Sequence, residues 1–227
     1  MDLNKKYFTD FLNGCGTKAV LFEPFISQYQ TETLIWRRGE QLWNTPENYI
    51  DTLIALSERT RSDIVFADMR GMNEENSQRL LEQISKCCKD VSERGFGIIT
   101  DNDNNIKLIE NSGVVDVLCV YGDIFSSTLP TIRMDGSAEN AIKLGYCGYY
   151  ITDNAEETLA KYSDKIRILG GLGKNNIENS SPVKIYSRVE SIYSEYGSKW
   201  ACGSGGQVSD EKYLELISLL GAFAHIR

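Results

Sequence analysis

The sequence predicts an α/β protein, a single (β/α)8 TIM barrel preceded by an N-terminal helix. Eight short apolar segments, rich in β-branched and aromatic residues, recur along the 227 residues, and nearly all precede a helical pattern. Such alternation implies parallel strands, and eight units close into a barrel. No segment reads as a linker, so residues 1–227 are expected to form one domain. A doubly wound open sheet usually has fewer strands and a glycine-rich first turn, where this chain has Glu23-Pro24-Phe25.

The first half of the chain supplies the N-terminal helix and four strands. Residues 1–13 carry apolar side chains at helical spacing, and we expect this helix to close the bottom of the barrel. Thr45 caps a second helix with Pro46 at its first position. Gly95 is expected to end the helix that starts at Asn73. The four strands are expected at residues 18–25, 64–67, 97–100 and 115–121, with a helix at about 105–111 after the third and a short or irregular one after the fourth.

The second half repeats the alternation. Ser137 and Ser209 are expected to cap helices, and Ser181-Pro182 to open another. A further helix is expected at 155–162. The four strands are expected at residues 131–134, 147–152, 165–169 and 198–202.

Composition excludes several classes of function. The net charge is −8 and no dense Lys/Arg run occurs, so we expect no nucleic-acid partner. No apolar segment approaches the ~20 residues that span a bilayer, and the first residues lack a signal peptide's apolar region, so we expect no membrane partner and a cytoplasmic location. The six cysteines have no metal-binding spacing and His225 is the single histidine. We therefore expect buried thiols, no metal and no cofactor. A homodimer is left open.

The segment 63–72, DIVFADMRGM, contains the first candidate for a site. Its apolar strand stops in Asp68 and Arg70, and in a barrel the carboxyl ends of the strands face the site. Asp68 is the catalytic candidate and Arg70 a substrate-binding one. Other carboxylates at strand ends could cap helices, or could together bind a divalent metal. They are Glu23, Asp101, Asp103, Asp123, Asp135 and Asp153.

An arginine pair lies in the longest loop. Arg37 and Arg38 stand between Trp36 and Trp43. Arginine forms planar bidentate pairs with carboxylates, so the loop suits an anionic small-molecule ligand. A salt bridge to Glu40 or to a neighbouring helix is the alternative.

Glycine-rich turns follow the last two strands. In barrels these turns often hold a phosphate with backbone N–H groups, and Lys174 could assist Gly171, Gly173 and Gly203 here. The alternative is that glycine only permits the tight turns.

Several segments resemble the uroporphyrinogen decarboxylase superfamily, which also contains methyltransferases, over about residues 36–220. They are VFADMRGM (65–72), WRRGEQLW (36–43), ILGGLG (168–173) and YGSKWACGSGGQVSDEKYLELISLL (196–220). The resemblance implies a lyase-type or methyltransferase-related barrel for an anionic, tetrapyrrole-like ligand. It also implies a substrate-facing Asp68, carboxylate binding by Arg37 or Arg38, and a substrate-facing turn at Ser204 and Gly205.

The chain departs from both catalytic patterns of that superfamily. Where the decarboxylases carry a histidine in the last glycine-rich turn, residues 203–206 read Gly-Ser-Gly-Gly. Where the zinc methyltransferases carry His-x-Cys, residues 133–135 read Arg-Met-Asp. Two alternatives follow: a non-catalytic corrinoid- or porphyrin-binding member, or a barrel enzyme whose phosphate-bearing ligand is held by the turns after strands seven and eight.

Overall fold

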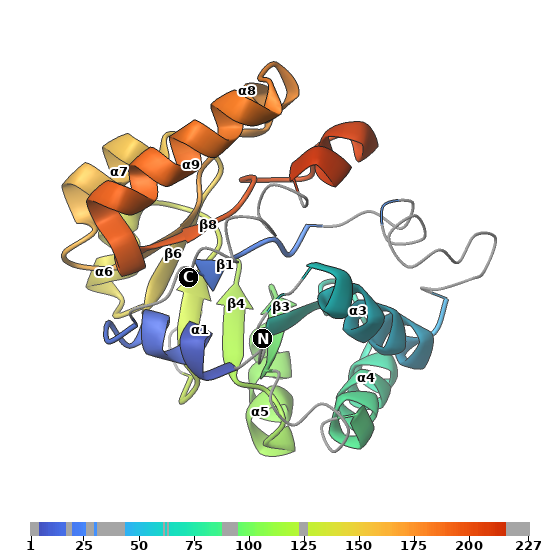
Figure 1. The fold of residues 1–227 in the computed structure, drawn as a ribbon. Helices are drawn as coiled ribbons and strands as arrows, with labels where there is room; N and C mark the ends of the chain where they lie inside the picture. The colour runs from blue at the N-terminus through green and yellow to red at the C-terminus, as the bar shows by residue number, and fades with distance from the viewer. Residues whose placement is uncertain are drawn as a thin grey trace.

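The computed structural model describes residues 5–16, 20–25, 30, 44–60, 62, 64–87, 95–122 and 127–216. Eight parallel strands form a curled half-barrel with helices between them, which confirms the predicted α/β barrel class (Figure 1). The strands are β1 (Val20–Leu21), β2 (Ile64–Asp68), β3 (Gly95–Thr100), β4 (Val117–Val120), β5 (Thr131–Arg133), β6 (Gly148–Ile151), β7 (Arg167–Gly170) and β8 (Trp200–Cys202).

The helices lie outside the sheet, apart from α1. Figure 1 shows α7, α8 and α9 over one flank and α3, α4 and α5 over the other. The helices are α1 (Lys5–Leu12), α3 (Pro46–Thr60), α4 (Glu74–Cys87), α5 (Asp103–Ser112), α6 (Ala138–Lys143), α7 (Ala155–Tyr162), α8 (Lys174–Glu178) and α9 (Pro182–Tyr196), with a 3-10 turn η1 (Gly197–Lys199) and helical residues 210–216. Within the described residues, no helix is both long enough and apolar enough to cross a bilayer.

The sheet runs in the order β1-β8-β7-β6-β5-β4-β3-β2, and each neighbouring pair is parallel. Parallel strands bring all their carboxyl ends to one edge, so the residues that follow them share one mouth. β1 and β2 are the two edge strands, and among the described residues no ladder joins them. The curl is therefore open between β1 and β2.

The core has an inner and an outer layer. Inside the curl, Phe8 and Phe11 of α1 pack with Phe22 and Phe66, whose rings lie 5.0 Å apart. At the opposite end from the mouth, the Lys5 ammonium lies 2.9 Å from Asp116, just before β4. Helix α1 thus closes the bottom, as predicted. The outer layer packs the alternate strand residues against the helices.

Three details differ from the expected elements. Gly95 begins β3 instead of ending a helix, because any Cβ there would lie 2.4 Å from Ile64 Cδ1 of the paired strand. Helix α8 was not expected, since its five residues are too short for a periodic pattern. Among the described residues of the first strand, the paired part is Val20–Leu21. In contrast, α7 has the predicted bounds, and Ser137 caps α6.

Candidate active site

A carboxyl group at the end of β1 is bound by the turn after β8. The Ser204 N–H donates to Glu23 Oε2 at 2.7 Å, and Ser204 Oγ lies 2.6 Å from Glu23 Oε1. The same Oγ also lies 2.6 Å from the carbonyl oxygen of Gly206. Ser204 is completely buried and Glu23 is partly buried.

A proton on Glu23 satisfies both contacts of the Ser204 hydroxyl. A hydroxyl has one hydrogen, so Ser204 cannot donate a linear hydrogen bond to both Glu23 and Gly206. If Glu23 is protonated, its carboxyl O–H donates to Ser204 Oγ, and Ser204 donates in turn to the Gly206 carbonyl. Both 2.6 Å contacts then contain a hydrogen. If Glu23 is ionised, one of the two contacts becomes a close approach of oxygens with no hydrogen between them.

The electrostatics agree with this geometry. Burial raises the pKa of Glu23 to about 7, although the hydrogen bonds that the Ser204 hydroxyl and N–H can donate to the ionised form oppose the rise. Burial, and then the charge of Glu23, also raise the pKa of Tyr150, Tyr213 and Cys202. Three groups from β6, the 210–216 helix and β8 thus lie within electrostatic range of one carboxyl.

Two of these groups have hydroxyls without partners. The Tyr150 ring lies inside the curl, 5.7 Å from the Phe22 ring and 5.4 Å from the Phe25 ring. Within the described residues, the buried hydroxyls of Tyr150 and Tyr213 make no hydrogen bond. A buried polar group without a partner is costly, so each of these hydroxyls suits ordered water or a polar ligand.

Glu23 also lines a narrow crevice at the opening between β1 and β2. Leu21, Pro24 and Phe66 are among the other lining residues, and its volume of about 30 Å³ admits a water molecule. Glu23 therefore borders a space large enough for one water molecule.

At the carboxyl end of β2, Asp68 and Arg70 form a bidentate ion pair. Arg70 Nε lies 2.9 Å from Asp68 Oδ1, and Arg70 Nη2 lies 2.6 Å from Oδ2. The guanidinium carbon lies 4.6 Å from the centre of the Tyr121 ring. The backbone N–H of Asp68 donates to the Tyr49 hydroxyl at 2.9 Å. The pair is more than one-third exposed and borders a pocket of about 360 Å³ between the starts of α3 and α4.

The structure brings only some of the predicted site residues together. Asp68 and Arg70 pair with each other at the end of β2, and Ser204, which precedes Gly205 in the turn after β8, binds Glu23. Arg37 and Arg38 lie outside the described residues, so their role stays a prediction. Lys174 is exposed at the start of α8.

Packing accounts for the glycines after β7 and β8. A Cβ on Gly203 would lie 2.1 Å from the Phe22 carbonyl oxygen, and one on Gly205 would lie 1.9 Å from that of Thr152. Gly171 and Gly173 have positive φ and are buried. The Ser204 N–H, which an anion would need, already binds Glu23. A phosphate role for these turns stays a prediction.

Several other strand-end carboxylates have local partners. Asp135 pairs with Arg133 at 2.5 Å, and Asp153 accepts from the Asn154 N–H at 2.7 Å. Asp123 lies outside the described residues. Among the described side chains, no three of His, Cys, Asp and Glu are grouped so as to hold a metal ion.

Sequence reasoning did not single out Glu23. It appeared only as one strand-end carboxylate among several, because its partner Ser204 is 181 positions away. The one local signal is a carboxylate directly after an apolar strand and before proline, and such a signal does not distinguish a capping residue from a proton-transfer group.

The fold and the mouth place this chain among the α/β barrels. No family model matches the sequence, and neither does any curated protein. One solved structure that matches is described as "Native KDPGal structure"; it is 11% identical, the match covers 71% of this chain and 93% of that one, and the TM-score is 0.42.

The expected relationship to the uroporphyrinogen decarboxylases is therefore wrong. No family model and no curated sequence supports it. The expectations of a decarboxylase or methyltransferase activity and of a tetrapyrrole or corrinoid ligand, which depended on that relationship, are wrong as well. The misleading segments contain strand residues and glycines that barrel packing itself requires, such as Gly203 and Gly205.

Proposed function

We propose that this chain is an enzyme that moves protons to and from a small polar molecule at the barrel mouth, with Glu23 as both acid and base. The observation that carries the proposal is the Ser204 hydroxyl, whose Oγ lies 2.6 Å from two oxygens, an arrangement that a proton on Glu23 satisfies. The position supports it, because barrel enzymes carry their chemistry at this end of the strands.

The surrounding groups can support both directions of transfer. Neutral Glu23 gives its proton to an oxygen or nitrogen of the substrate. The carboxylate that remains is held by the Ser204 N–H and by the Ser204 hydroxyl, which turns from Gly206 to Glu23. A carboxyl pKa of about 7 keeps both forms populated near neutral pH, as acid–base catalysis needs. The Tyr150 hydroxyl is available to donate to a substrate oxygen.

Schiff-base chemistry has less support. It needs a lysine amine within the site, and none of the eight described strands contains lysine. Proton transfer by a carboxyl is therefore the chemistry that the described mouth favours.

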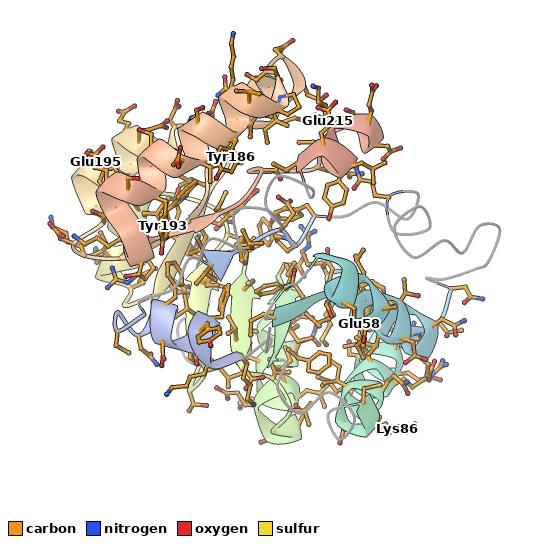
Figure 2. The ribbon with its side chains drawn as sticks, viewed as in Figure 1. Glu58, Lys86, Tyr186, Tyr193, Glu195 and Glu215 are labelled. Carbon is orange, nitrogen blue, oxygen red and sulfur yellow. The ribbon has the colours of Figure 1, made fainter. Side chains whose placement is uncertain are left out.

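The test compares the parent protein with Glu23→Gln against a mixture of small polar metabolites followed by mass spectrometry. Removing a general acid–base group should slow turnover about 10²- to 10⁴-fold. Glu195→Gln is the matched control, because Glu195 lies exposed on α9 at the periphery (Figure 2). Equal turnover by Glu23→Gln would refute the proposal. So would a Glu23 pKa near 4.5, measured by carbon-13 NMR of the carboxyl group.

A further inference from the structure

We propose that the pocket between the starts of α3 and α4 binds the oxyanion group of a small molecule, a carboxylate or a phosphate, through Arg70 and Arg79. The binding is inferred independently of Glu23. It rests on the proposed function only in taking the bound molecule to be the substrate.

The two arginines are held in the same way. Arg70 uses Nε and Nη2 to bind Asp68, and Arg79 uses the same two atoms to bind Glu47, at 3.0 and 2.8 Å. Within the described residues, Nη1 of neither arginine has a hydrogen-bond partner. A guanidinium presents five donors in a planar fork, so each arginine keeps donors for a second acceptor while one carboxylate fixes its orientation.

Both arginines line one pocket of about 360 Å³, a volume within the range of small-molecule sites. Thr45 and Asn76, from the starts of α3 and α4, line it as well. The positive ends of two long helices therefore add to the attraction for an anion. Asp68 is the one carboxylate among the described lining residues.

The pocket adjoins the mouth that contains Glu23. The Arg70 guanidinium lies over Tyr121, and Tyr121 packs with the inner core and lies within electrostatic range of Tyr150. Pro46 and Met72 provide apolar lining for the uncharged part of a ligand. An anionic group held by the arginines would thus anchor a molecule whose remainder points toward the mouth.

The experiment is calorimetric titration of the full chain with inorganic phosphate and, separately, with malonate. Glu47→Gln removes the carboxylate that neutralises Arg79, so it should strengthen binding about fivefold. Adding Arg79→Gln to that variant should weaken binding at least about tenfold relative to Glu47→Gln alone. The double variant avoids leaving a lone Glu47 that would repel the anion.

Glu156→Gln is the matched control. Glu156 also forms a bidentate pair, with Arg188 at 2.6 and 2.7 Å, but on α7 and outside the pocket. Glu156→Gln changes the net charge by the same amount as Glu47→Gln. Because Glu156 lies outside the pocket, this substitution should leave anion affinity unchanged. Urea unfolding of each variant checks that the fold is intact.

Distinct outcomes separate the ideas. Preference for phosphate or for malonate identifies the oxyanion, and both support the site. The inference is overturned if neither anion binds, if Glu156→Gln strengthens binding as much as Glu47→Gln, or if the double variant binds as Glu47→Gln does. Glu23→Gln should bind both anions like the parent. If Glu23→Gln turns over as fast as the parent while both proteins bind the anion, that result would instead count against the proposed function alone.

Discussion

Replacing Glu23 by glutamine should change how stability depends on pH. In the folded protein the Glu23 pKa is about 7, against 4.5 for the ordinary side chain. Because the folded pKa is raised, the contribution of Glu23 to stability is fully present below pH 4.5 and is lost as the pH rises through 7. One pKa unit corresponds to about 1.36 kcal/mol, so the loss amounts to about 3 kcal/mol. Glutamine stays neutral, and its amide can replace the carboxyl proton at Ser204.

The measurement is urea unfolding of the parent and of Glu23→Gln at several pH values from 4 to 8. The difference in the free energy of unfolding, variant minus parent, should rise by about 3 kcal/mol across that range, because only the parent carries the penalty of ionising Glu23. Glu195→Gln should give a nearly flat difference. A flat difference for Glu23→Gln as well would show that Glu23 ionises normally. The conclusion that Glu23 carries a proton beside Ser204 would then be wrong.

Three further predictions concern the same mouth. Tyr150→Phe removes a buried hydroxyl that lacks a partner among the described residues. The free energy of unfolding should therefore stay the same or rise by up to about 1 kcal/mol, while turnover falls. A fall in the free energy of unfolding by more than about 1 kcal/mol would show that the hydroxyl makes a hydrogen bond. Gly205→Ala should destabilise the protein by at least about 2 kcal/mol in urea unfolding, because φ of Gly205 is +82° and the new Cβ would meet the Thr152 carbonyl oxygen. An unchanged urea midpoint would contradict that packing. Asp68→Asn should cost at most about 1 kcal/mol, since its pair with Arg70 is more than one-third exposed; a larger thermal destabilisation would make Asp68 a structural residue.

The fold was largely predictable because its signals are local. An apolar segment followed by a helical period identifies each unit, and Thr45-Pro46 and Ser137 mark helix starts through backbone hydrogen bonds that neighbouring residues make. Gly95 was assigned wrongly because glycine ends helices and also permits close packing of paired strands. Only the partner strand distinguishes the two.

The family assignment failed for a related reason. Strand-end acids and glycine-rich turns are features that any parallel barrel needs, so short similarities at those positions carry little information about ancestry. Asp68 illustrates this point, since its carboxylate is held by the adjacent Arg70.

The sequence by itself determined the order of strands and helices, the parallel barrel class and the presence of carboxylates at the carboxyl ends of the strands. Each of these features depends on the spacing of apolar residues in one short segment and on the residues that end it. Tertiary structure alone decided the environment of Glu23. The curl of the sheet brings Ser204 of the last turn against its carboxyl group and excludes most of the water. The raised pKa arises from that burial, which no segment of the chain can produce without the rest of the barrel.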